Sequence, residues 1–186
     1  MLKGNKGKVK IIGGKWRGRW LEFSGIDDLR PTPNRVRETV FNWLGQTLTD
    51  KTCLDLFAGS GALGFEALSR GAQCVDFVEE NRISVQALRA NATKLSAHNA
   101  TVFAQDSWQW VNSHNGVYDI IFLDPPFKKT DYASLLRLIK AKLAPQGIIY
   151  CESPKGLAID EQWQVIKQAQ AGQVQYQLLQ ENRITT

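Results

Sequence analysis

The chain has 186 residues, of which 43% are hydrophobic, and it carries 23 Lys and Arg against 18 Asp and Glu. This length suffices for one well-buried core, and no apolar run approaches the roughly 18 residues that indicate a membrane-spanning helix. No apolar stretch follows the basic N-terminus, so we expect no secretory signal, no membrane partner and a cytoplasmic protein.

Cysteine and histidine are few and scattered along the chain. Cys53, Cys74 and Cys151 fall in or beside predicted strands, and neither they nor His98 and His114 have the spacing of metal ligands. Isolated cysteines in a reducing compartment usually behave as small buried hydrophobic residues. We therefore expect no metal site.

The positive charge is concentrated near the N-terminus. Residues 1–37 hold ten Lys and Arg against three Asp and Glu, whereas the remaining residues hold 13 basic and 15 acidic side chains. This asymmetry indicates a basic arm attached to a nearly neutral domain. A polyanion such as nucleic acid would suit the arm, but a solvated surface would produce the same pattern.

The arm itself predicts a β-hairpin, with strands over residues 6–11 and 15–21 joined at two glycines. Because side chains alternate along a strand, Trp16 and Trp20 would share one face for packing. The other face would be basic and could contact phosphates or remain a solvated face: Lys6, Lys8 and Lys10 in the first strand, and Lys15, Arg17 and Arg19 in the second.

A proline-rich segment, residues 30–33, precedes a predicted helix. Thr32 suits the N-cap, and Pro33 suits the first helical position, because its fixed φ is already helical. Apolar residues then recur at helical spacing, which indicates a core-facing stripe: Val36, Val40, Trp43 and Leu44.

From residue 50 onward, strands and helices alternate. Strands are predicted at 52–57, 73–79, 101–105, 118–123 and 147–152, and helices at 62–70, 83–97, 107–112 and 132–143. This order is typical of βαβ units and a parallel sheet with helices on both faces. Residues 163–169 and 174–180 predict an antiparallel hairpin that completes a seven-stranded, mostly parallel sheet.

A glycine-rich loop joins the first of these strands to its helix. Gly59, Gly61 and Gly64 match the pattern G-x-G-x-x-G, in which glycines allow a tight turn and a close approach to a ligand at a helix N-terminus. Glu79 lies 20 residues after Gly59, where a carboxylate can bind both hydroxyls of a ribose. Together they indicate an adenosine-containing cofactor, without saying which one.

Two further carboxylates favour S-adenosylmethionine over a nicotinamide or flavin cofactor. Asp55 precedes the glycines, where it would repel a pyrophosphate but could accept a hydrogen bond from the ammonium of an amino acid. Asp106 follows the third strand of the sheet and could accept one from the adenine amino group. A charged residue in an apolar strand needs a partner, so Asp55 could instead be a purely structural carboxylate.

The sequence Asp124-Pro125-Pro126-Phe127 follows the apolar run 118–123. Two prolines hold the backbone rigid, since proline fixes φ and lacks an N–H. A carboxylate before them and an aromatic ring after them could grip a flat ring that bears an amino group. The alternative is a purely structural turn.

These features together resemble the Rossmann-like class I methyltransferases that use S-adenosylmethionine to methylate amino groups. Four segments, 11–19, 30–42, 54–67 and 124–127, are similar in order and spacing to the RsmD family. The resemblance implies methylation of the N2 amino group of one guanine in bacterial 16S ribosomal RNA. It also implies, as partner, that RNA or a small-subunit assembly particle, and a monomeric enzyme.

The candidate site residues fall into three groups. In the active site, Asp124 and the Pro125 carbonyl would accept hydrogen bonds from the amino group, and Phe127, after Pro126, would stack on the base. The predicted cofactor-binding residues are Asp55, Phe57, Gly59, Gly61, Glu79, Asp106 and Ser107. The predicted RNA contacts are Lys8, Lys10, Lys15, Arg17, Arg19, Arg30 and Arg35, with Arg37 as a further candidate.

We expect two parts, an arm over residues 1–30 and a methyltransferase domain over residues 31–186. Methylation of adenine N6 or of a protein glutamine remains an alternative, because closely similar tetrapeptides serve both reactions. A catalytically silent RNA-binding assembly factor is an alternative from another class of protein, against which the intact Asp124 argues.

Overall fold

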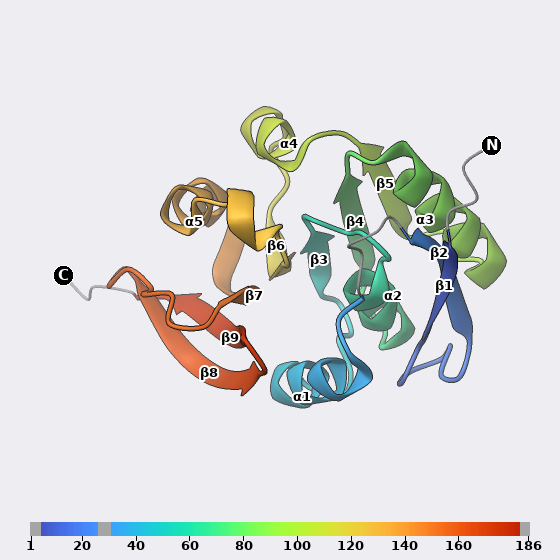
Figure 1. Ribbon diagram of the computed structural model, residues 1–186, viewed down its shortest axis with the longest axis horizontal. Coiled ribbons are helices and arrows are strands. Elements are labelled where there is room, and N and C mark those ends of the chain that lie inside the picture. The colour runs from blue at the N-terminus through green and yellow to red at the C-terminus, as the bar shows by residue number, and fades with distance from the viewer. Residues whose placement is uncertain (1–4, 26–30, 183–186) are drawn as a thin grey trace.

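The computed structural model describes residues 5–25 and 31–182. These residues form a two-stranded antiparallel hairpin, β1 (Asn5–Lys10) and β2 (Trp20–Gly25), and a seven-stranded sheet in the order β5-β4-β3-β6-β7-β9-β8. The N-terminal hairpin lies beside α3 at one end of the molecule, and strands β8 and β9 lie at the other end (Figure 1).

Five strands of the large sheet run parallel, and two close it in antiparallel fashion. The parallel strands are β3 (Thr52–Asp55), β4 (Cys74–Glu79), β5 (Ala100–Ala104), β6 (Tyr118–Leu123) and β7 (Leu143–Pro154). β9 (Val174–Glu181) pairs antiparallel with both β7 and β8 (Trp163–Ala171). The predicted seven-stranded, mostly parallel sheet with a C-terminal hairpin is confirmed.

Helices cover both faces of this sheet. One face carries α1 (Asn34–Leu44), α2 (Ala62–Ser69) and α3 (Arg82–Leu95), and the other carries α4 (Ser107–Ser113) and α5 (Tyr132–Ile139). Two short 3-10 helices, η1 (Phe127–Lys129) and η2 (Lys140–Lys142), flank α5.

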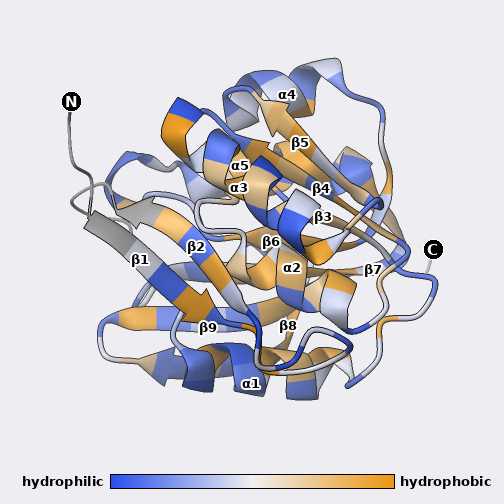
Figure 2. Cartoon of the chain, turned by 90° about the vertical axis from the view of Figure 1, so that its right-hand side faces the viewer, coloured by the Kyte–Doolittle hydropathy of each residue, from blue (hydrophilic) through white to orange (hydrophobic). Residues whose placement is uncertain are grey.

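Alternation along each strand divides the buried side chains between two cores. Cys53 packs in the core beneath α1, α2 and α3, whereas its neighbour Leu54 packs in the core beneath α4 and α5. This is the expected pattern for a strand that is covered on both faces. Figure 2 shows the hydrophobic residues concentrated in the middle strands of the sheet and many hydrophilic residues along α1.

From residue 50 onward, every predicted helix and strand is present and ends within four residues of its predicted boundary. None of the helices in the described part of the chain combines the length and the apolar character needed to cross a bilayer.

The N-terminal hairpin is present, but its second strand was predicted too early. Residues 15–18 form a turn, and β2 begins at Trp20. The backbone N–H of Lys15 donates to the Ser69 carbonyl at 2.7 Å, and that of Trp16 donates to the Ser69 hydroxyl at 2.9 Å. Trp16 is buried while Trp20 is 47% exposed, so the predicted shared face of the two tryptophans is wrong.

Gly14 permits this contact between the turn and the C-terminal end of α2. A Cβ atom at this position would lie 1.9 Å from the Ser69 carbonyl oxygen, and the residue has a φ of +72°. Any other residue would therefore push the turn away from α2.

The start of α1 also differs from the prediction. The helix begins at Asn34, with Pro33 at the N-cap position, and no side chain caps it. The Thr32 hydroxyl donates instead to Glu152 Oε1, at 3.0 Å, on the distant strand β7. A tertiary hydrogen bond thus replaces the predicted local cap, and this bond brings residues 31–33 to the carboxyl edge of the sheet.

Candidate active site

A cavity of about 680 Å³ opens at the carboxyl ends of the parallel strands. Strand order reverses direction between β3 and β6, and ligands bind at such switch points in open α/β sheets. The loops after β3, β4, β5 and β6 contribute to the wall of the cavity, as do Glu152 on β7 and residues 31–33. The topology therefore gathers segments that are far apart in the sequence around one space.

The glycine loop and Glu79 form one wall of this cavity. Glu79 Oε2 accepts a hydrogen bond from the Gly59 N–H, and Oε1 accepts one from the Asn81 N–H, both at 2.8 Å. A carboxylate has about four acceptor positions, so each oxygen can accept further hydrogen bonds from a ligand. Gly59 and Glu79, both predicted cofactor residues, line the cavity together.

Gly61 shapes the loop from below and does not line the cavity. It has the left-handed conformation, with φ of +74°, and a Cβ atom there would lie 2.5 Å from Leu88 and 2.8 Å from Phe65. Only glycine allows α2 to start this close to α3.

Asp55 is likewise placed beneath the loop and not along the cavity. Its side chain is buried and accepts a hydrogen bond from the Gly64 N–H at 3.1 Å, in the first turn of α2. Burial raises the pKa of Asp55 to about 7, because the hydrogen bond from Gly64 only partly offsets the loss of solvation, and the charge of Glu79 raises it further. The contacts of Asp55 are those of a carboxylate that holds the glycine loop on the sheet.

Asp106 and Ser107 lie at the start of α4 and both line the cavity. Asp106 caps the helix by accepting the Gln109 N–H at 2.9 Å, and the Ser107 hydroxyl donates to the Leu56 carbonyl at 2.5 Å. The predicted Phe57 also lines the cavity, together with Trp108, which the sequence did not single out. The sequence signal for Trp108 was its position as an aromatic residue directly after the predicted site residues Asp106 and Ser107.

All four residues from Asp124 to Phe127 line the cavity, next to the glycine loop. Pro125 is buried, Pro126 is exposed, and Phe127 begins η1. Burial raises the pKa of Asp124 well above its usual range, and the negative charges of Glu152 and Asp55 raise it further. No cation in the described part of the chain forms an ion pair with Asp124.

Glu152 is a second carboxylate at the cavity, and it was not among the residues predicted from the sequence. It lies on β7, is only 7% exposed, and accepts hydrogen bonds from Thr32 and, at 2.7 Å, from Tyr150. Burial raises the pKa of Glu152, although both hydrogen bonds act in the opposite direction. Its place at the carboxyl end of a predicted strand, as for Asp124, was the signal that could have identified it.

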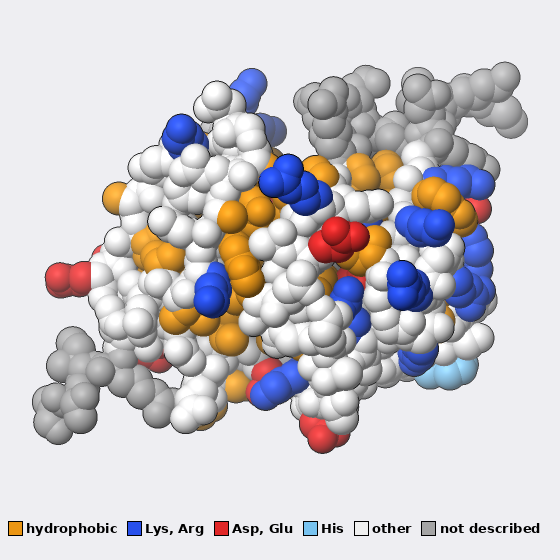
Figure 3. Space-filling model, turned by 90° about the horizontal axis from the view of Figure 1, so that it is seen from below, with side chains coloured by type: hydrophobic (Ala, Val, Ile, Leu, Met, Phe, Trp, Pro, Cys, Tyr) orange, Lys and Arg blue, Asp and Glu red, His pale blue; other side chains and the backbone are white. Residues whose placement is uncertain are grey.

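The predicted RNA contacts that fall among the described residues lie outside the cavity. Six are exposed: Lys8, Lys10, Lys15, Arg17, Arg19 and Arg35. The seventh, Arg30, falls outside the described residues. The end of the molecule that carries β1, β2 and α3 shows a gathering of Lys and Arg side chains in Figure 3.

Several of these basic groups have partners nearby. Lys8 Nζ lies 3.8 Å from a carboxylate oxygen of Glu22, and Lys10 Nζ lies 5.4 Å from the centre of the Trp20 ring. Arg19 donates to the Lys94 carbonyl at 2.9 Å. These are exposed, weak contacts that leave the charges accessible to a polyanion.

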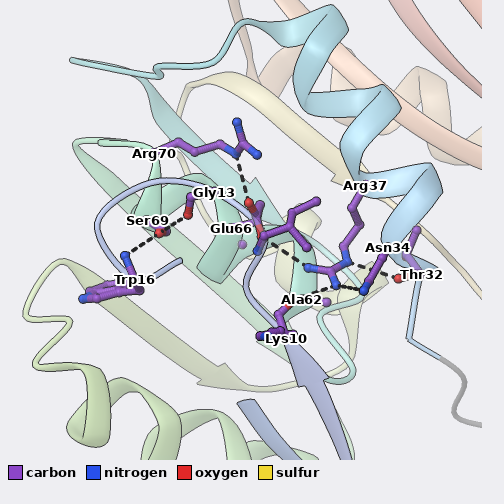
Figure 4. A network of polar contacts seen from close by, with 12 residues as sticks. Lys10, Gly13, Trp16, Thr32, Asn34, Arg37, Ala62, Glu66, Ser69 and Arg70 are labelled. Carbon is purple, nitrogen blue, oxygen red and sulfur yellow. Dashed lines mark hydrogen bonds and ion pairs between the residues drawn. The ribbon is translucent and has the colours of Figure 1, made fainter. Parts of the chain in front are cut away.

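Arg37, by contrast, is fully buried, and its assignment as a phosphate contact is wrong. Its guanidinium lies 3.2 Å from Glu66 Oε2 and donates to the carbonyls of Thr32 and Lys10, at 3.2 and 2.8 Å. Figure 4 shows these contacts and the second arginine of the network, Arg70, on the other side of Glu66. Arg37 ties the N-terminal hairpin and α1 to α2.

Within the described ranges, no group of three or more His, Cys, Asp or Glu side chains is arranged to hold a metal ion. The doubly wound sheet and its switch-point cavity have the Rossmann-like fold of class I methyltransferases. The family model described as "Conserved hypothetical protein 95" matches residues 9–180.

Similar proteins with names identify the family to which the chain belongs. The chain is 41% identical to Ribosomal RNA small subunit methyltransferase D of Escherichia coli strain K12, over 94% of this chain and 90% of that protein. It is also 41% identical to the protein of the same name from Haemophilus influenzae, over 94% and 95% of the two chains. The chain belongs to the RsmD family of ribosomal RNA small subunit methyltransferases.

A solved structure agrees with this assignment. The putative methyltransferase yhhF from Escherichia coli has a TM-score of 0.84 and 41% sequence identity, and the match covers 95% of this chain and 99% of that one.

Proposed function

We propose that this protein transfers a methyl group from S-adenosylmethionine to the N2 amino group of a guanine in 16S ribosomal RNA. The observation that carries the proposal is the placement of Asp124, Pro125 and Phe127 in the same cavity as Gly59 and Glu79. Membership of the RsmD family, whose named members are small-subunit ribosomal RNA methyltransferases, supports the substrate class.

The cavity wall fits the parts of S-adenosylmethionine. Glu79, already oriented by two backbone N–H groups, offers acceptors for the ribose hydroxyls. Phe57 and Trp108 would provide apolar surface for the adenine ring, with Asp106 beside them as an acceptor for its amino group. Ser107 holds this end of α4, while Asp55 and Gly61 set the shape of the glycine loop.

When bound, S-adenosylmethionine supplies a methyl group that its sulfonium makes electrophilic. The guanine N2 is a poor nucleophile because its lone pair is delocalised into the ring. Asp124 and the Pro125 carbonyl would accept hydrogen bonds from the amino group and steer the nitrogen toward tetrahedral geometry. Phe127 would stack on the base, a contact worth roughly 1–3 kcal/mol.

Methylation would leave the amino nitrogen with one proton to give up. Asp124 would accept that proton and pass it to solvent. Its raised pKa makes the ionised carboxylate a stronger base than an ordinary aspartate. Positioning of the amino group and proton acceptance would together lower the barrier.

The exposed basic residues would hold the RNA backbone outside the cavity. Lys8, Lys10, Lys15, Arg17 and Arg19 on the N-terminal arm and Arg35 on α1 are available for this role, and Arg30 stays a prediction. The target base must be unpaired or turned out of its stack to enter the cavity. The proposal includes a division into an arm and a methyltransferase domain, a cytoplasmic monomer, and a small-subunit assembly particle as partner.

Replacing Asp124 with Ala tests the proposal. We expect the rate of methyl transfer to small ribosomal subunits that lack the modification to fall at least ~100-fold, because positioned proton acceptors typically contribute that much. The dissociation constant for S-adenosylmethionine should change less than about threefold, since Glu79 and the glycine loop remain. Calorimetry measures the dissociation constant for S-adenosylmethionine, and mass spectrometry of the nucleosides measures methyl transfer. Asp160→Asn, which lies outside the cavity, is the control.

The nucleoside products separate the candidate activities. N2-methylguanosine from the wild-type protein supports the proposal, whereas N6-methyladenosine or a methylated ribosomal protein would overturn it. An absence of any methylated product would favour a silent assembly factor. Equal loss of cofactor binding and methyl transfer in Asp124→Ala would refute the role given to Asp124.

A further inference from the structure

We infer that Glu152 selects guanine over adenine by accepting a hydrogen bond from the N1–H of the target base. The inference rests on the proposed transfer to guanine and adds the residue that sets the choice of base. Two observations support it: Glu152 lies beside Asp124, and only one of the two carboxylate oxygens of Glu152 accepts hydrogen bonds from the protein.

Sheet register places the two carboxylates side by side. β6 and β7 are parallel neighbours in which Leu123 is paired with Cys151. The next residues along the two strands are Asp124 and Glu152, so their backbones are separated by about the 4.8 Å spacing of adjacent strands. Both side chains line the cavity, and the charge of Glu152 contributes to the raised pKa of Asp124.

The two oxygens of Glu152 have different surroundings. Oε1 accepts hydrogen bonds from the hydroxyls of Thr32, at 3.0 Å, and Tyr150, at 2.7 Å. Oε2 has no hydrogen-bond partner in residues 5–25 and 31–182, and the atom is accessible to solvent. The two hydroxyls therefore fix the carboxylate through Oε1 and leave Oε2 as an acceptor toward the cavity.

This arrangement matches the edge of guanine and opposes that of adenine. Guanine presents N1–H directly beside the N2 amino group, so both positions are donors. Adenine presents an acceptor, N1, beside its amino group. With the amino group held by Asp124 and the Pro125 carbonyl, an acceptor from the neighbouring strand meets the N1–H of guanine but faces the N1 lone pair of adenine.

Replacing Glu152 with Gln should reverse this preference. The hydroxyls of Thr32 and Tyr150 donate to the Oε1 position, so they hold the amide oxygen there and turn the NH2 group toward the cavity. That NH2 group would oppose the N1–H of guanine and would complement an acceptor at N1. The change is nearly isosteric and removes one of two adjacent carboxyl groups.

The test compares guanosine with 2,6-diaminopurine riboside, which keeps the 2-amino group but has an acceptor at N1. Ligand-observed NMR gives both dissociation constants on the full chain, independently of catalysis. Wild type should bind guanosine at least ~10-fold more tightly, the ratio expected for one hydrogen bond to a buried charged group. In Glu152→Gln, this ratio should disappear or invert.

Two controls isolate the role of the Oε2 acceptor. Glu80→Gln removes a charge from another wall of the same cavity and should preserve the preference for guanosine. Tyr150→Phe removes one donor to Oε1 but keeps the carboxylate, and it should also preserve the direction of the preference.

Equal affinities of the wild type for the two nucleosides would overturn the inference, and this comparison does not depend on how any variant folds. A Glu152→Gln protein that still prefers guanosine tenfold would overturn it as well. Failure of the proposed function appears elsewhere, as an absence of N2-methylguanosine in ribosomal RNA. The two failures are therefore distinguishable.

Discussion

Glu66 and the Asp124–Glu152 pair are acidic groups in the same fold with opposite surroundings. The carboxylate of Glu66 is fully buried between two arginines, with Arg37 at 3.2 Å and Arg70 at 3.0 Å. Asp124 and Glu152 are next to each other at the carboxyl ends of β6 and β7, and no cation among the described residues lies within ion-pair distance of either.

The difference separates an acidic group that holds the fold together from acidic groups that await a ligand. Removing a charge from water is costly, and a buried carboxylate persists as an ion only where cations and N–H groups compensate it. Around Glu66 the protein supplies this compensation, including the Ile12 N–H at 2.9 Å. At Asp124 and Glu152 the compensation is incomplete, and donors on a bound base would complete it.

Breaking the Glu66 network should have the largest effect on stability. We expect Glu66→Gln to lower the free energy of unfolding by about 3–5 kcal/mol, because two buried arginines lose the charge that compensates them. Urea titration measures the change. Glu38→Gln removes the same charge from an exposed position on α1 and should change stability by less than ~0.5 kcal/mol. A loss below 1 kcal/mol in Glu66→Gln would contradict the structural role.

Asp55 is a buried carboxylate without a cation as partner among the described residues, and its contribution to folding stability should depend on pH. Its pKa is about 7 in the folded protein against 3.8 when exposed, so the folded state keeps a proton that the unfolded state loses between these values. Stability from this group is therefore complete below pH 3.8 and is lost as the pH rises toward 7.

Asp55→Asn should abolish this dependence while keeping an acceptor for the Gly64 N–H. The stability of the variant relative to wild type should rise with pH by about 1.4 kcal/mol per unit between pH 4 and 7. Unfolding curves across that range provide the measurement. A difference that stays constant with pH would show that Asp55 is ionised in the folded protein.

The smallest effect is expected from the arginine that α1 exposes, two residues before the buried Arg37. Arg35→Gln should leave stability within ~0.5 kcal/mol of wild type. It should weaken RNA binding a few-fold at low salt and reduce the slope of log affinity against log salt by about 1. RNA titrations at several salt concentrations test this, and an unchanged slope would remove Arg35 from the interface.

Much of the fold follows from local patterns. Apolar runs after residue 50 predicted the strands, and the glycine loop and Glu79 predicted one wall of the cavity. These features could be predicted because residues close in sequence determine them. The register that brings Glu152 beside Asp124 could not be predicted, since it depends on the pairing of β6 with β7 across a connection that includes α5 and two 3-10 helices.

The errors lie where a distant partner outcompeted a local preference. Thr32 has the side chain of a helix cap, but its hydroxyl bonds Glu152, 120 residues further along the chain. Residues 15–18 have the alternation of a strand, but their backbone docks on Ser69. Arg37 resembles its exposed neighbour Arg35 in the sequence, and only the packing of α1 on α2 shows which of the two is buried.

The sequence by itself therefore determined the class of fold, the glycine loop and the tetrapeptide Asp124–Phe127, because each depends on short-range periodicity or on adjacent residues. Tertiary structure alone decided which charges are paired and which face the cavity. Burial and ion pairing are properties of side chains from different elements, so the same residue type becomes structural at Glu66 and a candidate ligand contact at Glu152.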